Sequence, residues 1–535
     1  MATLARSLTR PFHRVFHLEY YWQALIVVIV GSFMVMLDTT VVNIALPRII
    51  TVFGADVHST QYVLTGYMLA LAIIMPATGY LTDTFGTKRI YLLSMLFFTL
   101  GSALCAGAWN VPSLVLFRLL QGLGGGMLMP LGMTIIFKVV PPEKRGMVTG
   151  VFGLPMLLGP VIGPTLGGYI VEYIDWRFIF TLNLPVGAIG LLLGAVLLRE
   201  TETRNDLHPD VKGFILSGIA FGALLYALSE APTDGWDAPY IVVLLVMGSM
   251  ALIGWVWVEL TVEQPLVELK VFRITTYTLA TLVNFIITLG LFSSMFLLPI
   301  FFQNFRGLGA METGLLMMPQ ALASAVTMPI SGKLFDKIGP RPLVVTGLLL
   351  MAYSTWKLSF LDLSTSDDAV REILIMRGLA MGLITMPAMT VAMNAIPPHL
   401  IARSSSLTNV LRQVFGSFGT AIFATLLQNR QTFHQAIISQ TVTPDNLTVQ
   451  TTVARVQMLL EQHGMNAVQA KEALVMALYQ RVAMAASVMS FENCFYIAAA
   501  ICLVGILPAL LLHTTGIVQR GAGSPMIRNS SRTPV

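Results

Sequence analysis

The sequence predicts an all-α polytopic membrane protein with fourteen transmembrane helices. Of its 535 residues, 55% are hydrophobic and only 11% are charged, and the mean hydropathy is +0.76. A soluble domain carries about 25% charged residues, so most of this chain is expected to face lipid. Its apolar runs reach the roughly 20 residues that a helix needs to cross a bilayer. Unbroken runs of this length exclude a β-barrel, whose strands alternate over about ten residues.

The apolar segments define the expected spans and their orientation. They lie near residues 23–45, 60–79, 90–109, 112–134, 147–170, 178–198, 213–229, 239–258, 276–302, 313–331, 342–360, 371–393, 404–427 and 494–513. An even number of spans places both termini on one side. Segments assigned to the side of the amino terminus hold twenty Lys and Arg residues, against five in the short loops opposite. The positive-inside rule therefore predicts a cell-membrane protein with both termini in the cytoplasm.

An internal repeat divides the chain into two halves. The pattern MPxxGxLxDxxG at 75–86 recurs at 328–339, and Leu46-Pro47 recurs as Leu298-Pro299. The two copies of the longer pattern have the same expected orientation in the membrane. Parallel repeats of this kind build transporters whose two halves rock about a central site. The repeat therefore favours a carrier over a passive channel or a non-transporting membrane sensor.

The expected organisation has five parts. They are a cytoplasmic leader (1–22), a first six-helix bundle (23–198), an inserted helix pair comprising spans seven and eight (199–275), a second six-helix bundle (276–513) and a cytoplasmic tail (514–535). The second bundle includes a long outer loop, 428–491, with a helical stretch from about Val449 to Met489 and a break at Gly464. This loop could be a packing cap or a docking surface for a periplasmic partner.

Two ionisable residues inside the lipid are candidates for function, because charges there are costly. Asp38 in the first span and Arg118 in the fourth lie roughly 9–12 Å below the outer boundary, at 1.5 Å per residue. Matched depth in one half lets them pair. Asp38 would then exchange a proton according to whether Arg118 or a bound cation neutralises it. The alternative is a structural pair that holds the two helices in register.

Two further intramembrane arginines, Arg377 and Arg412, have no obvious acidic partner in the sequence. Either could line a polar cavity together with Asn409 and Gln413. The chain also contains 30 Met and 29 Phe residues. Some of them are expected to line a pliable pocket, because methionine adapts to ligands of varied shape.

The fifth span contains a repeated Gly-Pro pattern. Glycines spaced four residues apart share one helical face and let another helix approach closely, and prolines bend the helix. We expect this face to pack against the opposite half and to separate from it during transport. Packing alone would need the glycines but not the repeated Gly-Pro pairs. The residues are Gly159, Pro160, Gly163, Pro164, Gly167 and Gly168.

The loop between the second and third spans is the first copy of the repeat. Its glycines permit a tight turn, its aspartate can cap or pair with a neighbouring element, and its basic residues anchor the cytoplasmic interface. Recurrence in the second half favours a conformational latch over a plain topology signal. The candidate latch residues are Gly79, Asp83, Gly86, Lys88 and Arg89, with Asp336 in the second copy.

Several classes of protein are excluded. No GxxxxGK[ST], GxSxG, HExxH or GxGxxG motif occurs, so we expect no enzyme activity and no cofactor, and transport must draw on an ion gradient or a partner. Cys105, Cys494 and Cys502 lack CxxC spacing, so no metal site or disulfide is expected. The net charge of +5 fits cytoplasmic loops that face anionic lipid and does not require nucleic acid.

With these motifs, the chain resembles the major facilitator superfamily, and specifically its fourteen-span drug:proton antiporters of the EmrB/QacA type, over nearly its whole length. LDTTVVNIALP at 37–47 is similar to the first-span motif, whose acid is taken to serve proton coupling, and RLLQGLG at 118–124 to a motif whose arginine is implicated in proton transfer. The Gly-Pro span resembles the antiporter motif found in exporters. WRFIFTLNLPVG at 176–187 resembles a further signature of this branch. Thr84 and Thr87 replace basic residues usual in the latch loop, which weakens its charge relay.

The resemblance implies a major facilitator fold of two six-helix bundles plus two inserted helices. It also implies a proton-coupled antiporter that exports amphipathic or cationic drugs and similar small molecules by alternating access. An exporter of an endogenous lipid or metabolite would carry the same motifs. The expected partners are the small-molecule substrate, protons, membrane lipid and, as in some EmrB-like pumps, a periplasmic adaptor protein.

Overall fold

The computed structural model describes residues 18–512, apart from 205, 442–449, 452, 457 and 459–465. Within these residues the secondary structure is entirely helical, without strands, so the expected all-α class is confirmed. Eleven helices are long and apolar enough to cross a membrane, or twelve if a bent pair counts as one span. The expected number of fourteen spans therefore remains a prediction.

The first group of helices spans residues 20–197 and forms the first half of the molecule. Its members are α2 (Tyr20–Phe53), α3 (Val57–Ile74), α4 (Ala77–Phe85), α5 (Thr87–Ala106), α6 (Val111–Val139), α7 (Arg145–Phe152), α8 (Leu154–Tyr173), α9 (Phe178–Thr181) and α10 (Asn183–Leu197). The α3–α4 pair is bent by 54° at Met75-Pro76, because proline lacks the N–H that would continue the helix. The expected fifth span is likewise divided between α7 and α8.

The second group follows an inserted pair, α11 (Val211–Asp234) and α12 (Pro239–Thr261). It consists of α13 (Thr275–Ile300), α14 (Ala310–Ile338), α15 (Pro340–Leu358), α16 (Asp367–Asn394), α17 (Ile401–Thr441), α19 (Ala467–Val504) and α20 (Ile506–Leu510). Neither α8 nor α15 is among the eleven apolar helices. For α15 the reason is compositional, since it has Arg341 and Lys357 near its ends and polar residues between them.

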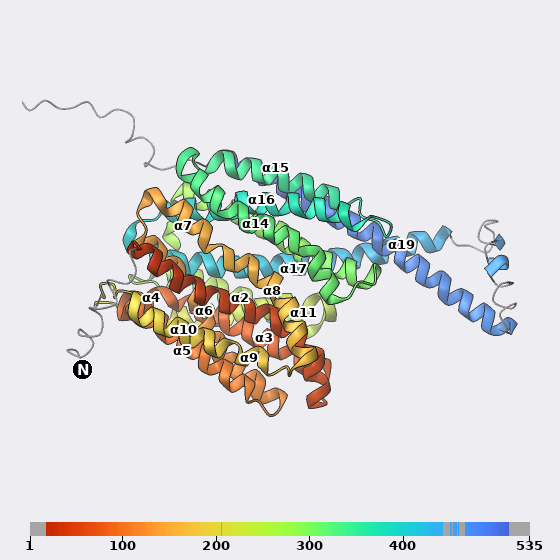
Figure 1. Cartoon of the computed structure of the whole chain (residues 1–535), viewed down its shortest axis with the longest axis horizontal. Coiled ribbons are helices and arrows are strands. Elements are labelled where there is room, and N and C mark those ends of the chain that lie inside the picture. Colours follow the sequence, from red (N-terminus) through yellow and green to blue (C-terminus); the bar gives the residue numbers. More distant parts are fainter. Residues whose placement is uncertain are drawn as a thin grey trace, which may run out of the picture.

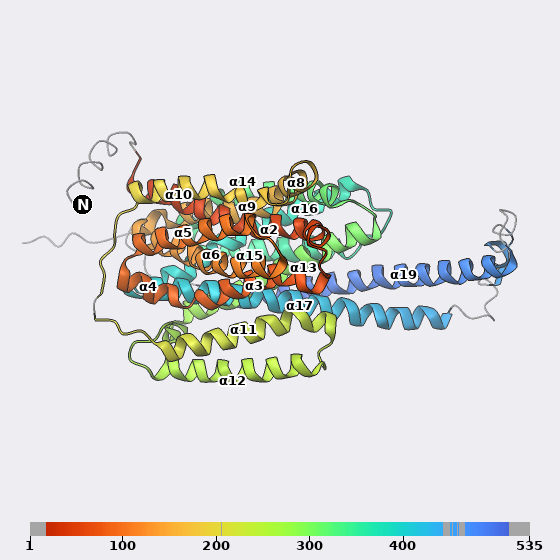
Figure 2. The same ribbon diagram turned by 90° about the horizontal axis from the view of Figure 1, so that it is seen from below.

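The two groups lie side by side with α17 running between them. In Figure 1, α14, α15 and α16 lie on one side of α17, and α2, α5, α6 and α10 on the other. The α11–α12 pair forms an outer layer, with α11 against α3 and α17 (Figure 2). The arrangement agrees with two bundles plus an inserted pair, while the domain limits expected from the sequence stay a prediction.

The repeat glycines mark one end of the bundle. Gly86 ends α4 with φ of +93° and Gly339 ends α14 with φ of +80°, and a residue with a side chain rarely adopts this conformation. We call this end, which is expected to be cytoplasmic, the Gly86 end, and the opposite end the Trp176 end. The described chain both starts and stops at the Gly86 end, as Figures 1 and 2 show.

Much of the segment expected as an outer loop, 428–491, is helical, and the helical stretch expected from Val449 to Met489 agrees with α19 over residues 467–489. Helix α17 continues to Thr441 and α19 begins at Ala467, so both helices extend beyond the bundle as an antiparallel hairpin (Figures 1 and 2). The helix continues because residues 428–441 contain neither glycine nor proline. Gln431 Nε2 donates to Ser487 Oγ at 3.3 Å, which connects the two helices of the hairpin. The expected break at Gly464 lies outside the described residues.

Candidate transport site: a closed end, a buried carboxylate and a central cavity

The second copy of the repeat binds across the boundary between the two halves. Asp336 Oδ1 accepts a hydrogen bond from the Gly146 N–H at 2.9 Å, and Oδ2 accepts one from the Met147 N–H at 3.1 Å. These N–H groups belong to the first turn of α7, which has no intrahelical acceptors for them. Asp336 of the second half therefore caps a helix of the first.

The first copy makes a related contact in the opposite direction. Asp83 lies 3.8 Å from the Arg403 Nε at the start of α17, and 3.8 Å from the Lys138 Nζ of its own half. A Cβ atom at Gly79 would lie 2.8 Å from the Cα of Arg403, so only glycine allows this approach. Asp83 and Gly79 thus face α17, as Asp336 faces α7.

Lys88 and Arg89 do not reach the opposite half. The Lys88 Nζ donates to the Ala195 carbonyl at 2.6 Å, and the Arg89 Nε lies 3.6 Å from the Glu200 carboxylate. Glu200 Oε1 also accepts from the Lys88 N–H at 3.0 Å. Both basic residues therefore join the latch loop to the segment after α10 of the same half. Of the six candidate latch residues, Gly79, Asp83 and Asp336 make the contacts between halves.

Two glycines on α7 let the backbones of the two halves approach each other closely. Cβ atoms at Gly146 and Gly332 would each overlap the carbonyl oxygen of the other residue. One at Gly150 would lie 2.6 Å from the Met328 carbonyl oxygen. The Thr149 and Thr390 hydroxyls share a hydrogen bond of 2.8 Å nearby. Sequence reasoning missed this pair, although its four-residue spacing, 146 to 150, was visible in the sequence.

The Gly-Pro span packs on two sides: α8 contacts α14 of the opposite half, as expected, but its glycines face α2 of the same half. The glycines of α8 pack against α2 of the same half: a Cβ would lie 2.7 Å from Met36 Cβ at Gly159 and 2.9 Å from Val41 Cγ1 at Gly167. At Gly163 it would overlap Thr40 Oγ1. Gly168 faces away and meets nothing within 4 Å. Spacing shows which residues share a face, but not which helix approaches that face. Pro160 and Pro164 lie in the same helix.

Asp38 and Arg118 form a buried ion pair. Arg118 Nη1 lies 2.6 Å from Asp38 Oδ2, and the two side chains are 0% exposed. The guanidinium carbon lies 3.8 Å from the centroid of the Tyr67 ring, and Nε donates to the Val63 carbonyl at 3.3 Å. The pair connects α2 to α6 in the core of the first half. Loss of the negative charge of Asp38 would leave the charge of Arg118 without a partner, which is unfavourable because no water reaches this site to stabilise it.

Two amides complete the surroundings of the carboxylate, and sequence reasoning gave them no role. Asp38 Oδ1 accepts from Gln121 Nε2 and from Asn183 Nδ2, each at 2.9 Å. Ser102 Oγ accepts from the same two amides at 2.7 and 3.2 Å. Both amides belong to the motifs at 118–124 and 176–187, so the signal was present in the sequence, but their convergence on Asp38 needed the fold. The carboxylate thus has three hydrogen-bond partners from two other helices, Arg118 and Gln121 on α6 and Asn183 on α10, while Ser102 on α5 holds the two amides.

The second half has an arginine at the matching place but no acid. Arg377 on α16 donates to Thr355 Oγ1 on α15 and to the Gly290 carbonyl on α13. The offset that relates Leu46-Pro47 to Leu298-Pro299 also relates Asp38 to Gly290. A backbone carbonyl thus stands where the first half has a carboxylate. Arg377 is buried in the interior of its own half and does not line the cavity described next.

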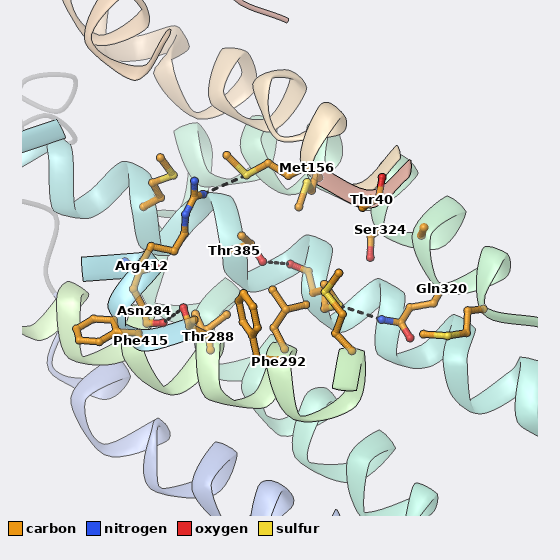
Figure 3. Close-up of a pocket in the computed structure, with 18 of the residues that line it drawn as sticks. Thr40, Met156, Asn284, Thr288, Phe292, Gln320, Ser324, Thr385, Arg412 and Phe415 are labelled. Atoms are coloured by element: carbon orange, nitrogen blue, oxygen red, sulfur yellow. Dashed lines mark hydrogen bonds between the residues drawn. The ribbon is translucent and has the colours of Figure 1, made fainter. Parts of the chain in front are cut away.

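A cavity of about 500 Å³ lies between the two halves (Figure 3). Helices α2 and α8 of the first half and α13, α14, α16 and α17 of the second contribute to its wall. It reaches from Thr408 and Met389, beside the residues that join the two halves at the closed end, to Gln303 and Thr313 at the Trp176 end. The halves are in contact at the Gly86 end, so the space between them lies toward the Trp176 end.

The cavity wall combines polar and apolar side chains. Six polar residues that line it are Thr40, Asn43, Asn284, Gln320, Asn409 and Arg412. Six apolar ones are Met156, Phe292, Met317, Met381, Met389 and Phe415. Of the four cavity candidates from the sequence, Asn409 and Arg412 are therefore in the wall. Gln413 is not, because the next residue on a helix points about 100° away.

Comparison with known proteins decides the family. The profile of the Major Facilitator Superfamily matches residues 28–420, which is most of the chain. The chain belongs to the major facilitator superfamily. Its relatives include the Bacillus subtilis (strain 168) protein named "Uncharacterized MFS-type transporter YhcA", 36% identical over 91% of this chain and 92% of the relative. The "Multidrug resistance protein B homolog" of Mycobacterium tuberculosis (strain ATCC 25618 / H37Rv) is 36% identical over 77% of each chain.

Solved structures of this superfamily share the fold. The human organic anion transporter MFSD10 superposes with a TM-score of 0.58 at 13% identity, over 91% of this chain and 99% of that one. The proton:xylose symporter XylE superposes with a TM-score of 0.57 at 13% identity, over 91% and 94%. At this identity the likeness shows the fold alone. This major facilitator protein is thus a multi-pass membrane transporter and not an enzyme.

Proposed function

We propose that this transporter is a proton-coupled antiporter that exports amphipathic drugs and similar small molecules by alternating access. The observation that carries the proposal is that α2 contributes to two separate sites, the buried Asp38 cluster and the wall of the cavity. Asp38 lies in a buried polar cluster, while Thr40 and Asn43, two and five residues further along α2, line the cavity. A change in the charge of Asp38 therefore acts on a helix that also forms the cargo site. Relatives named for multidrug resistance support the drug class.

The proposed cycle follows from these contacts. In the conformation described here, Asp38 neutralises Arg118, the Gly86 end is closed, and the cavity lies toward the Trp176 end. Protonation of Asp38 would remove the countercharge of Arg118 and weaken the connection between α2 and α6. Because the α8 glycines hold α8 against α2, a shift of α2 would move α8 and, through the α7–α8 segment, the contacts of α7 with the second half. Asp83 and Asp336 would re-form the closed end after each cycle.

Topology and partners extend the proposal. The Gly86 end would face the cytoplasm of a cell membrane, with fourteen spans in all, as in EmrB/QacA-type antiporters. The repeat and the closed inter-half contact support a rocking carrier. The α17–α19 hairpin would then project from the outer face, where a periplasmic adaptor protein could bind. The small molecule, protons and membrane lipid are the remaining partners.

The test is dye movement driven by a pH gradient in proteoliposomes. Wild-type protein should move a fluorescent amphipathic dye against a proton flux, and a protonophore should abolish the movement. Asp38→Asn should lose it, whereas Asp362→Asn, a substitution in the loop between α15 and α16, should retain it. If Asp38→Asn moved the dye at the wild-type rate, Asp38 would have no role in proton coupling. Dye movement without counter-movement of protons would indicate a channel.

A further inference from the structure

The charge of the cavity wall is positive and comes from one residue. Arg412 is the only ionisable side chain among the described residues that line the cavity, and none of those residues is an aspartate or glutamate. The remaining polar groups are amides and hydroxyls. A cationic cargo would therefore meet a like charge and no countercharge in this wall. An anionic cargo would meet an opposite charge, that of Arg412.

Arg412 lacks an acidic partner of its own. Its Nη2 donates to Asn409 Oδ1 at 3.0 Å, and its Nη1 lies 3.3 Å from the Met156 sulfur, a weak acceptor. In the described part of the chain, no carboxylate oxygen lies within 4.0 Å of its nitrogens. Asp38, which does not line the cavity, is paired with Arg118. Arg412 thus presents guanidinium N–H groups with no anionic acceptor.

The position of Arg412 directs this charge at the cargo. It extends from α17 across the cavity toward Met156 on α8, so it bridges the two halves (Figure 3). An unpaired charge at membrane depth is costly, and such residues normally pair with another group or mark a substrate pathway. The planar guanidinium matches carboxylate, sulfonate and phosphate groups through two parallel hydrogen bonds. A bound anion would supply the missing partner.

The rest of the wall fits the other part of such a molecule. Phe292 and Phe415 lie in the wall near Arg412, and several methionines line it further along. Aromatic and thioether groups adapt to apolar bodies of varied shape. A volume of about 500 Å³ lies within the range of small-molecule sites, roughly 300–1,000 Å³. One charged group beside an apolar surface is the complement of an amphipathic molecule with a single acidic group.

We propose that the cavity selects amphipathic anions, and that Arg412 is the specificity-determining residue that binds their acidic group. This inference rests on the proposed export function and narrows its cargo. The sequence led us to expect amphipathic or cationic drugs, and this inference keeps the amphipathic class but replaces the cationic group by an acidic one. The same contact places the acidic group between α17 and α8, so the cargo would bind both halves at once.

The experiment compares two dyes that share one ring system. Fluorescein at pH 7.5 is an anion and rhodamine 123 is a cation, and fluorescence anisotropy measures their binding to the full chain in phosphatidylcholine nanodiscs. Wild type should bind fluorescein at least about tenfold more tightly than rhodamine 123. Arg412→Gln should weaken fluorescein binding about tenfold or more, Arg412→Lys should retain most of it, and Arg412→Glu should favour rhodamine 123. Arg430→Gln, on the projecting part of the same helix, is the matched control.

Three results would overturn the inference. They are absence of fluorescein binding above empty nanodiscs, equal or tighter binding of rhodamine 123 by wild type, and unchanged fluorescein binding by Arg412→Gln. Retained binding by Arg412→Lys shows that the site tolerates a substitution at this position, so a loss in Arg412→Gln reports the positive charge. Asp38→Asn distinguishes the two proposals, because it should bind fluorescein while losing proton-driven movement. If the wild-type protein bound fluorescein but moved no dye under a pH gradient, antiport would be refuted and the anion selectivity of the cavity would stand.

Discussion

The contact between Gly332 and Gly146 allows a direct test of the closed end. Gly332→Ala would place a Cβ 2.7 Å from the carbonyl carbon of Gly146 and in overlap with its oxygen. Both are backbone atoms of α7, so neither can rotate away as a flexible side chain would. Overpacking of this kind costs about 1–3 kcal/mol. Since the contact exists only when the Gly86 end is closed, the closed state should lose roughly 5- to 150-fold in population relative to the open one.

The assay is the labelling rate of a cysteine placed in the closed contact. Ser405 is buried there and donates to the Pro130 carbonyl of the other half at 2.8 Å. In a Ser405→Cys background, Gly332→Ala should accelerate reaction with a water-soluble maleimide toward that 5- to 150-fold range. Gly254→Ala on α12 is the matched control, since its Cβ would lie 3.7 Å from Leu216 in ordinary contact. Equal labelling of both variants would refute the assignment of this contact to closure.

Three more predictions concern the α8 glycines, the Asp38 cluster and the α7 cap. Gly163→Ala, which forces a Cβ into α2, should lower the unfolding temperature in detergent and the rate of export, while Gly168→Ala, with open space around it, should leave both within error. Asn183→Leu removes a donor to the Asp38 carboxylate and should reduce proton-driven dye movement in proteoliposomes without loss of dye binding; unchanged coupling would leave the amide a packing role. Asp336→Ala should weaken closure by about 0.5–2 kcal/mol, as loss of a helix cap does, and raise maleimide labelling; a rate equal to that of the parent would contradict the capping role.

The sequence predicted the buried pair well, because depth in the membrane is a property of each helix. Counting residues from a span end placed Asp38 and Arg118 at one level, and their side chains meet at 2.6 Å. Which helices are neighbours is a property of the fold. For this reason the partner of the Gly163 face, and the rotation that excludes Gln413 from the cavity, lay beyond the sequence.

The end of α17 was hard to predict because hydropathy and helix propensity indicate different residues. Hydropathy ended the thirteenth span near residue 427, but helix propensity continues α17 to Thr441, since a helix does not end where its apolar character does. The contact of two amide side chains with Asp38 could be predicted only in part. Gln121 and Asn183 were within recognised motifs, but the sequence alone gave no reason for two amides 62 residues apart to face one carboxylate.

The length of α17 has a mechanical consequence. At 1.5 Å per residue its 41 residues extend about 60 Å, twice the thickness of the bilayer hydrocarbon core. Near its first turn, Ser405 and Ser406 donate to carbonyls of the other half, and its far part projects beyond the bundle. Because the first part of α17 is packed in the bundle and its last part projects, a small tilt of the packed part would become a larger displacement at Thr441. A protein bound to the hairpin would therefore be displaced when the transporter changes the side to which its cavity opens.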